Sequence, residues 1–282
     1  MKKASPILLI VLALAALDGF LWYSILPSFS GDLAVYFLDV GQGDSQLVHL
    51  PGGAKILIDS GPDGKVLREL GRALPGGDRY IDLLLLTHPE ADHIGGFVDI
   101  LKRYEVGAVL LTGRGKDTDT WREFKKILSD KKIPAISLRE GDRVSQGESR
   151  FDILSPGPEY MASAALNDTS IVSLLTSRSA SFLFTADIDE NLERHLAEKY
   201  DLRADVLKVA HHGSKYSSSE EFLREVSPKI AVIQVGKGNS YGHPTKEALS
   251  RLGATGATVY RNDADGGVAV LADGVTLSVL KY

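Results

Sequence analysis

Histidine and acidic residues gather in one short segment of the chain, Thr87-His88-Pro89-Glu90-Ala91-Asp92-His93-Ile94-Gly95-Gly96. The segment directly follows the apolar run 81–86, which is typical of a buried strand, so its polar side chains stand where the chain leaves a sheet. His88 and His93 offer imidazole nitrogens and Asp92 offers a carboxylate, all common ligands of divalent metal ions. The glycine pair 95–96 would let the backbone pass close to the bound group. We interpret the segment as part of a metal site; the alternative is a loop in which Asp92 only caps a helix.

Further candidate ligands follow strand patterns later in the chain. Asp187 closes the apolar pattern 182–186, a position at which open sheets commonly expose functional side chains. Its carboxylate could bridge two metal ions, or it could cap the following helix. His211 and His212 follow the pattern 206–209. Because successive residues at a strand end point in opposite directions, we expect one of the two to bind metal and the other to contact its neighbour or the substrate; the sequence leaves open which.

His243 lies in the glycine-containing loop 236–244, which follows another strand pattern. Histidine can donate a proton near neutral pH, so His243 is a candidate for protonating a leaving oxygen or for binding a phosphate. Ser214, Lys215 and Tyr241 are placed in the sequence to touch the same anion. Five of the seven histidines thus follow strands, a distribution that core packing alone would not favour.

Asp39 and Asp44 enclose the loop Asp39-Val40-Gly41-Gln42-Gly43-Asp44-Ser45. Either carboxylate could orient a ligand histidine from behind, which would fix the ring for metal binding. The alternative is that the two glycines only form a tight hairpin. The residues alone do not decide between these interpretations.

Apolar and amphipathic segments alternate along the chain in a pattern that would position these residues. Strand patterns lie at 33–38, 46–49, 55–58, 81–86, 108–111, 133–138, 151–154, 170–176, 182–185, 206–209, 230–235 and in the closing segment to 282. Helix patterns lie at 65–74, 94–104, 120–131, 188–199, 218–226 and 245–252. We predict an α/β protein with two mixed sheets covered by helices.

Composition limits the function classes. The chain has 282 residues and 44% apolar content, enough for one large core, and neither a repeat nor a linker divides residues 31–282. The absence of cysteine excludes disulfides and thiolate ligands, which leaves His, Asp, Glu and Asn as metal ligands. A net charge of −5 argues against broad wrapping of nucleic acid. A polyanionic substrate would therefore be held locally.

Residues 1–30 differ from the rest of the chain. Lys2 and Lys3 precede the largely apolar segment 6–26. An apolar stretch of about 20 residues can span a bilayer, and a shorter one after lysines suits a signal peptide. Both interpretations export residues 31–282, and we favour the uncleaved anchor because no small-x-small cleavage site precedes Ser28. We expect an extracytoplasmic domain, anchored to the membrane by an N-terminal helix or secreted if the segment is cleaved.

Taken together, the motifs resemble those of the metallo-β-lactamase fold family, an αββα sandwich of two mixed β-sheets flanked by helices. The similarity is greatest to the extracytoplasmic domain of ComEC competence proteins and their stand-alone relatives, and it covers residues 32–282. The motifs that carry it are 39–45, 87–96, Asn167-Asp168-x-Ser170, 185–187, 207–214 and 242–244.

This resemblance implies two divalent metal ions. One would be held by His88 with the oxygen donors Glu90, Asn167 and Asp187, and the other by Asp92, His93, Asp187 and either His211 or His212. Glu90 and Asn167 stand where the wider family has histidines, so the first set is rich in oxygen. Oxygen-rich ligation suits Mn²⁺ or Mg²⁺ better than Zn²⁺, whereas the second set suits Zn²⁺ or Mn²⁺. We therefore expect Mn²⁺, with Zn²⁺ or Mg²⁺ as alternatives.

The resemblance also implies hydrolysis of a phosphodiester, in which Asp92 and Asp187 hold the metal pair and orient the nucleophile, and His243 assists the leaving group. We expect a nuclease acting on DNA outside the cytoplasm, related to DNA uptake or nucleic-acid scavenging, with the DNA-uptake machinery as a candidate partner. Two alternatives stay open. One is a metal-dependent hydrolase of a small ester, lactone or lactam, and the other is a non-catalytic surface module that binds nucleic acid.

Overall fold

The computed structural model describes residues 14, 17, 32–178 and 180–282. Residues Gly31–Tyr282 form one compact unit, and the fold is described for this unit alone. The predicted anchor or signal segment lies outside the described residues, apart from Leu14 and Leu17. No helix among the described residues combines the length and apolar character needed to cross a bilayer.

Eight strands form the first sheet. They are β1 (Leu33–Phe37), β2 (Gln46–His49), β3 (Lys55–Ile58), β4 (Tyr80–Leu85), β5 (Glu105–Leu111), β6 (Ala135–Ser137), β14 (Val268–Ala272) and β15 (Leu277–Lys281). Their spatial order is β15-β14-β1-β2-β3-β4-β5-β6. Neighbours from β15 to β3 run antiparallel, and those from β3 to β6 run parallel.

Seven strands form the second sheet. They are β7 (Arg143–Gln146), β8 (Ser149–Ser155), β9 (Val172–Ser177), β10 (Ala180–Phe184), β11 (Val206–Lys208), β12 (Ile230–Ile233) and β13 (Thr258–Arg261). Their order is β13-β12-β11-β10-β9-β8-β7. The strands β10 to β13 are parallel and β7 to β10 are antiparallel, so each sheet has one parallel half.

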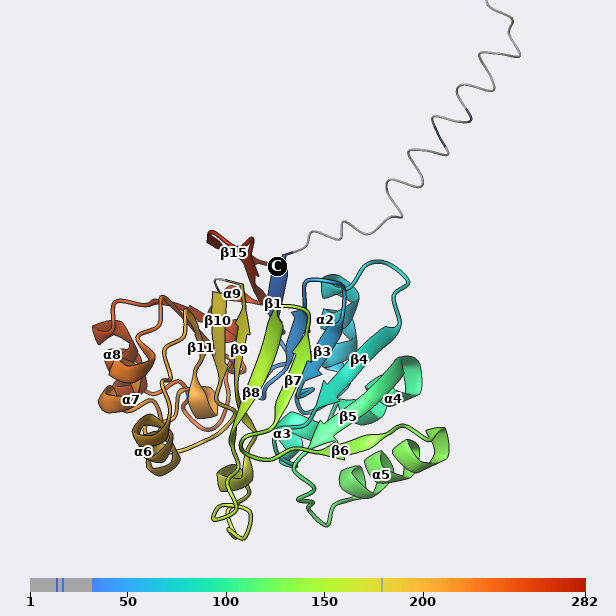
Figure 1. Cartoon of the computed structure of the whole chain (residues 1–282), viewed down its shortest axis with the longest axis horizontal. Helices are drawn as coiled ribbons and strands as arrows, with labels where there is room; N and C mark the ends of the chain where they lie inside the picture. The colour runs from blue at the N-terminus through green and yellow to red at the C-terminus, as the bar shows by residue number, and fades with distance from the viewer. Residues whose placement is uncertain (1–13, 15–16, 18–31, 179) are drawn as a thin grey trace, which may run out of the picture. The chain divides into compact units, whose positions relative to one another are not determined.

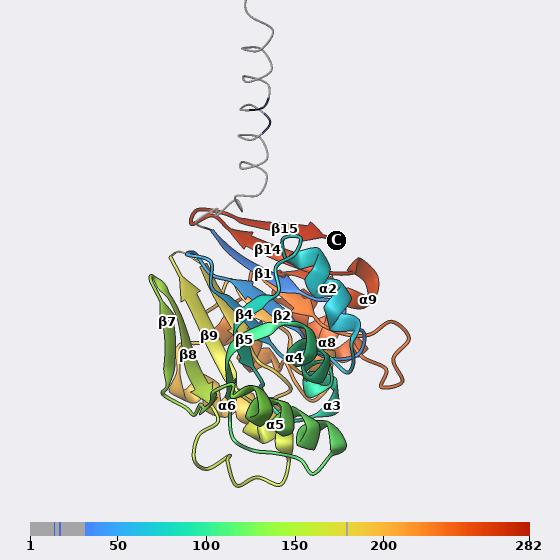
Figure 2. The same ribbon diagram turned by 90° about the vertical axis from the view of Figure 1, so that its right-hand side faces the viewer.

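Helices cover the outer face of each sheet. The helices are α2 (Lys65–Ala73), α3 (Ala91–Ile94), α4 (Phe97–Arg103), α5 (Asp119–Lys131), α6 (Glu190–Lys199), α7 (Glu220–Val226), α8 (Lys246–Ala254) and α9 (Asn262–Asp265), with the short 3₁₀ helices η1 (Leu166–Thr169) and η2 (Ala210–Gly213). The α2, α4 and α5 layer packs on the first sheet, and the α6, α7 and α8 layer packs on the second (Figure 1). Figure 2 turns the α2, α4 and α5 layer toward the viewer. The predicted αββα sandwich is confirmed.

Strand alternation explains why three apolar layers form. In β3, Ile56 and Ile58 point into the core between the sheets, and Leu57 between them points to the helix layer. All four residues of β3 are buried, as expected for a strand covered on both faces. The same division holds in the second sheet, where Phe182 and Phe184 face the inter-sheet core and Leu183 faces the helices.

The structure differs from the sequence expectation at the helix 94–104, at β7 and at α9, which lies within the predicted closing strand segment. The predicted helix 94–104 is divided into α3 and α4, because the Gly96 amide donates to the Gly61 carbonyl oxygen at 3.1 Å instead of to its own helix. Gly95 and Gly96 also pack directly against other main chain. A Cβ on Gly95 would lie 2.0 Å from the Pro62 carbonyl oxygen, and one on Gly96 would lie 2.4 Å from that of Ser60. The glycine pair thus accommodates a neighbouring loop rather than a bound group. Strand β7 was not predicted because its residues are polar and lie at the exposed sheet edge.

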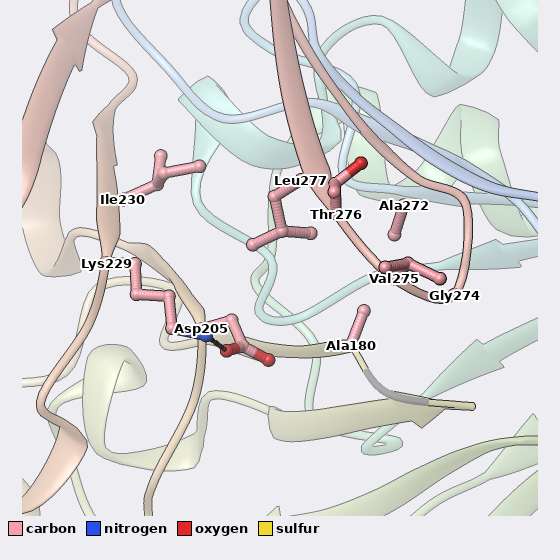
Figure 3. Close-up of a pocket in the computed structure, with 9 residues that line it drawn as sticks. All are labelled: Ala180, Asp205, Lys229, Ile230, Ala272, Gly274, Val275, Thr276 and Leu277. Atoms are coloured by element: carbon pink, nitrogen blue, oxygen red, sulfur yellow. Dashed lines mark ion pairs between the residues drawn. The ribbon is translucent and has the colours of Figure 1, made fainter.

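A pocket of about 380 Å³ opens between the sheets where β10, β11 and β12 begin (Figure 3). Asp205 and Lys229 line it and form an ion pair of 2.7 Å with each other, and most of its other lining residues are apolar. The candidate site residues lie instead beyond the opposite ends of these strands. The pocket is therefore separate from the chemistry predicted from the sequence.

Candidate metal centre

The carboxyl ends of four parallel strands, two in each sheet, carry polar residues of the site. Asp59 directly follows β3, and His88 follows β4 after two residues. In the second sheet, Asp187 comes after β10, and the histidine pair lies on η2 after β11. Because parallel strands expose their carboxyl ends at the same edge, residues far apart in sequence converge at one end of the sandwich.

Asp92, His93, Asp187 and His212, here the four-residue group, bring their donor atoms together. One ligand atom from each lies within 4.8 Å of the others. His212 Nε2 is 3.2 Å from Asp92 Oδ2 and 3.3 Å from Asp187 Oδ2, and His93 Nε2 is 3.3 Å from the same Asp187 oxygen. Two imidazole nitrogens and two carboxylate oxygens thus face a common point, a donor set suited to a divalent cation.

Hydrogen bonds behind the rings leave the Nε2 atoms available for a metal. His93 Nδ1 donates to Asp59 Oδ2 at 2.7 Å, and His212 Nδ1 donates to the carbonyl oxygen of Gln234 at 2.8 Å. Thr87 Oγ1 donates its hydrogen to Asp59 at 2.6 Å, so it accepts from His88 Nδ1 at 3.0 Å. Each imidazole is thereby oriented with its Nε2 atom toward the centre, as in metal sites.

Buried donor atoms without partners support the fit of a metal. Among the described residues, His88 Nε2 is buried and makes no hydrogen bond, and His93 Nε2 and Asp187 Oδ1 are buried with no contact stronger than ion pairs of 3.3 Å and 3.7 Å. A buried polar atom in this state is costly unless a ligand satisfies it. The residues present therefore fit a divalent cation, which would accept the lone pairs of these atoms.

The two adjacent histidines take different positions. His212 belongs to the four-residue group and is 2% exposed. His211 Nε2 lies 4.0 Å from Asp187 Oδ2, and the His211 ring is 5.8 Å from that of His243. Both histidines have left-handed backbone angles, with φ of 48° and 54°. This conformation is strained for residues with a side chain, and it turns the two rings in different directions at the strand end.

Glu90 and Asn167, with His88, form what we call the His88 side. Glu90 Oε2 makes an ion pair of 2.6 Å with Lys116 and does not belong to the four-residue group. Asn167 lies on η1, and its side chain makes no hydrogen bond within the described residues. The segment after η1 does reach the centre, because the Ile171 amide donates to the Thr87 carbonyl at 3.1 Å. The His88 ring lies 4.1 Å from the His93 ring.

The two acidic residues of the glycine loop also differ. Asp39 Oδ1 accepts a hydrogen bond from Gly41 N at 3.3 Å, within its own turn. Asp44 is fully buried, and its Oδ1 lies 3.3 Å from His212 Nδ1. Gly43 allows this approach, because a Cβ there would lie 2.3 Å from the Asp92 carbonyl oxygen.

Sequence reasoning missed three residues of the centre: Asp59, Lys208 and Gln234. Lys208 is 1% exposed; its ammonium pairs with Asp44, donates to Ala186 O at 2.9 Å and lies 3.7 Å from Asp187 Oδ1. The lysine at the end of the otherwise apolar strand β11 was the sequence signal that Lys208 contacts buried carboxylates. Asp59 gave another signal, because it follows a buried strand as Asp187 does. Gln234 gave none.

The charges of the centre shift the pKa values of its members. Burial lowers the pKa of His93 and His212, but Asp187 and the other carboxylates around them outweigh burial and raise both well above the usual value. Burial raises the pKa of Asp187, but His212 and His93 outweigh it and hold it well below the usual range. Burial, and then the charge of His93, lower the pKa of His88 to about 3. A cation entering the four-residue group must therefore displace protons.

The predicted substrate residues lie on two loops beside the centre. The Tyr241 ring is 6.0 Å from the His243 ring at an interplanar angle of 27°. Ser214 is buried, and Lys215 Nζ lies 4.8 Å from the Tyr216 ring centroid. The loops contact each other, since the Thr245 amide donates to the Gly213 carbonyl at 2.9 Å. Burial and the neighbouring His211 lower the pKa of His243.

Comparisons with known proteins agree with this architecture. ComE operon protein 3 of Bacillus subtilis is 32% identical over 263 residues, which cover 86% of this chain and 33% of that protein. Competence protein ComA of Neisseria gonorrhoeae is 31% identical over 257 residues, which cover 90% of this chain and 34% of that protein. The chain thus spans about a third of the length of these curated relatives.

Solved structures show the same fold. The metallo-beta-lactamase fold protein YhfI from Bacillus subtilis aligns with a TM-score of 0.56 at 16% identity, covering 82% of this chain and 96% of that chain. The family model of the metallo-beta-lactamase superfamily matches residues 38–237, which contain the whole four-residue group. The chain therefore belongs to the metallo-β-lactamase superfamily.

Proposed function

We propose that this chain is a metal-dependent phosphodiesterase that cleaves DNA outside the cytoplasm. The observation that carries the proposal is the four-residue group, whose two imidazoles and two carboxylates face one point. Most members of the superfamily are metal-dependent hydrolases. The chain's relative in Neisseria gonorrhoeae is a competence protein, which supports a role related to DNA uptake or nucleic-acid scavenging. The N-terminal segment would anchor the domain to the membrane.

The residues of the site would have distinct roles in cation binding and catalysis. Asp92, His93, Asp187 and His212 would hold one divalent cation, and His88 with Asp187, Glu90 and Asn167 would supply donors for a second. Bound cations would activate water and neutralise charge on a phosphoryl oxygen. Asp59 and Gln234 orient the ligand rings, and Lys208 holds the carboxylate of Asp187 from behind. His243 would bind the phosphate or protonate the leaving oxygen, with Lys215 and Ser214 beside the same anion.

The donor chemistry guides the choice of cation. The four-residue group supplies two nitrogens and two oxygens, which suits Zn²⁺ or Mn²⁺. The His88 side supplies mostly oxygen, which suits Mn²⁺ or Mg²⁺. Mn²⁺ is acceptable to both sets, so we propose it as the activating ion.

Cleavage of labelled oligonucleotides, with Mn²⁺, Mg²⁺ or Zn²⁺ added separately to metal-stripped protein, tests the proposal. We expect turnover to depend on added metal and Asp92→Asn to lower it by roughly 100-fold or more, because one of four donors is weakened. The matched control is Asp130→Asn, which changes an exposed carboxylate on α5 and should leave turnover unchanged. The same samples are then given bis-p-nitrophenyl phosphate and a panel of lactones and lactams. Turnover of a lactone or lactam without cleavage of any phosphodiester would overturn the proposal.

A further inference from the structure

Two exposed tyrosines lie at the rim of the metal centre. Tyr241 is 69% exposed and Tyr216 is 62% exposed. Each lies on a loop that also carries an imidazole of the site, Tyr216 after His212 and Tyr241 before His243. Tyr80, the other strongly exposed tyrosine among the described residues, is at the start of β4, at the opposite strand end. Large aromatic rings that are open to solvent beside a reaction centre are typical of surfaces that bind planar ligands.

A row of rings connects Tyr241 with the buried ligands. The Tyr241 ring is 6.0 Å from His243, His243 is 5.8 Å from His211, and the His211 ring is 6.1 Å from His212. The row runs from the exposed rim to a residue that is almost fully buried. A molecule that touches both Tyr241 and a cation at His212 must therefore extend over several ring spacings. An extended chain meets this requirement better than a compact lactone.

The same two loops carry positive charge without balancing carboxylates. The loop residues 211–219 and 236–245 contain Lys215 and Lys237 and no Asp or Glu, and the nearest carboxylates in sequence belong to the helices α7 and α8 that follow. Within the part of the chain that the structure describes, these two ammonium groups make no ion pair. Because the whole chain has a net charge of −5, this local excess is not a general property of the surface. It complements a polyanionic backbone.

Hydrogen bonds hold both loops in place. Asn239 accepts from the amides of Tyr241 and His243, each at 3.1 Å, and donates to the carbonyl oxygen of His243 at 2.6 Å. Arg251 of α8 donates to the carbonyl oxygens of Lys215, Ser217 and Ser218. The tyrosines thus stand on braced loops, which lowers the entropy cost of ordering them around a ligand.

We propose that Tyr241 and Tyr216 form a base-stacking platform for single-stranded DNA, with phosphates beside Lys215 and Lys237, an inference that rests on the proposed function. The platform specifies the strand state of the substrate. In a duplex the base faces are covered by their neighbours, whereas an unpaired segment can place its bases on exposed rings. The tyrosines thus contact bases, whereas the sequence assigned Tyr241 to the phosphate. Stacking accepts every base, so little sequence preference is expected.

Fluorescence anisotropy with a labelled 15-mer of thymidine tests the platform. The measurements use Asp92→Asn as background, so that cleavage does not interfere with binding. We expect Tyr241→Ala to weaken binding about tenfold, Tyr216→Ala to weaken it less because Lys215 covers part of that ring, and Tyr241→Phe to stay within about twofold of the background. Tyr80→Ala is the matched control and should bind like the background. A blunt 15-base-pair duplex should bind more weakly than the single strand.

An abasic strand of the same length separates stacking from charge. It keeps the phosphates and lacks the bases, so Tyr241→Ala should change its affinity less than about twofold. An equal loss with both strands, or no loss with either, would overturn the platform. Cleavage is scored separately on the protein with Asp92 intact. If that protein cleaves no phosphodiester but Tyr241→Ala still weakens binding of the strand with bases alone, the proposed function is wrong and the platform is supported. If the protein cleaves a phosphodiester but Tyr241→Ala has no such effect, the proposed function is supported and the platform is wrong.

Discussion

The four-residue group and the His88 side differ in how completely their donors converge. In the group, side chains from both sheets bring four donor atoms within 4.8 Å of one another. On the His88 side, only His88 presents a buried free nitrogen, while Glu90 is paired with Lys116. A carboxylate that is engaged in an ion pair must break that ion pair before it can bind a cation. The four-residue group therefore has its donor atoms close together without a bound cation, whereas the His88 side must rearrange to bind one.

Removal of Asp187 should have the largest effect, because we propose its carboxylate as a donor to both cations. We expect Asp187→Asn to weaken binding of the first Mn²⁺ by more than about 100-fold, since even the partners behind metal ligands typically contribute 10–100-fold. Titration calorimetry and metal analysis of the loaded protein measure this. Circular dichroism shows whether the variant is folded. A folded variant that keeps the affinity would show that the group does not hold the ion.

The pH dependence of metal binding should distinguish the two halves, because they release different numbers of protons. The surrounding carboxylates raise the pKa of His93 and of His212, which favours the protonated rings, so a cation that enters the group must displace protons from them. Affinity should therefore rise with pH, by about tenfold per pH unit for each proton released. His88, with a pKa of about 3, releases none. Calorimetry in buffers of different ionisation enthalpy counts the protons, and a count of zero would place the first ion on the His88 side.

Asp59 supports both halves, but unequally. It accepts directly from His93 and reaches His88 only through Thr87. We expect Asp59→Asn to weaken metal binding about 10–100-fold. Thr87→Val removes the hydroxyl contacts with His88 and with Asp59 but leaves the direct Asp59–His93 contact, so it should weaken binding less. Metal-dependent thermal shifts of the two variants measure the difference. A greater loss in Thr87→Val would mean that the His88 side binds the first ion.

Glu90→Gln should have the smallest effect. Its carboxylate is already engaged with Lys116, so affinity for the first ion should change less than about threefold. Lys116→Met is the companion variant, because it frees the carboxylate without removing it. If the His88 side rearranges to bind a second ion, Lys116→Met should strengthen that binding and Glu90→Gln should weaken it. If a two-site titration showed that Lys116→Met weakens binding of the second ion or that Glu90→Gln strengthens it, Glu90 would not be a donor.

The strand-end positions made much of this architecture predictable. Apolar runs ending in His, Asp or Glu identify both parallel halves, because buried strands leave only their ends for polar chemistry. The α/β class and the two mixed sheets follow from the alternation of segments and are confirmed. Strand β7 could not be found this way, because an exposed edge strand needs no apolar pattern.

The finer contacts of the site depend on packing between distant segments. Which of His211 and His212 faces the group is decided by backbone angles that the local residue types do not specify. The pairing of Glu90 with Lys116 joins loops 26 residues apart. Asp59 and its partner His93 are 34 residues apart, and neither local pattern shows that the two side chains meet. Such contacts become visible only when the sheets are assembled.

Gln234 makes the metal centre sensitive to the spacing of the two sheets. The side-chain amide of Gln234 donates to the carbonyl oxygens of Leu38 and Ser45 beside the first sheet. Its main-chain carbonyl oxygen accepts a hydrogen bond from the His212 ring beside the second sheet. Any change that moves one layer over the other is thus transmitted to a ligand ring. Repacking the interior far from the centre, for example at Leu33 at the start of β1, would therefore alter cation affinity as well as folding stability. Selection on catalysis would then also act on residues that never meet the substrate.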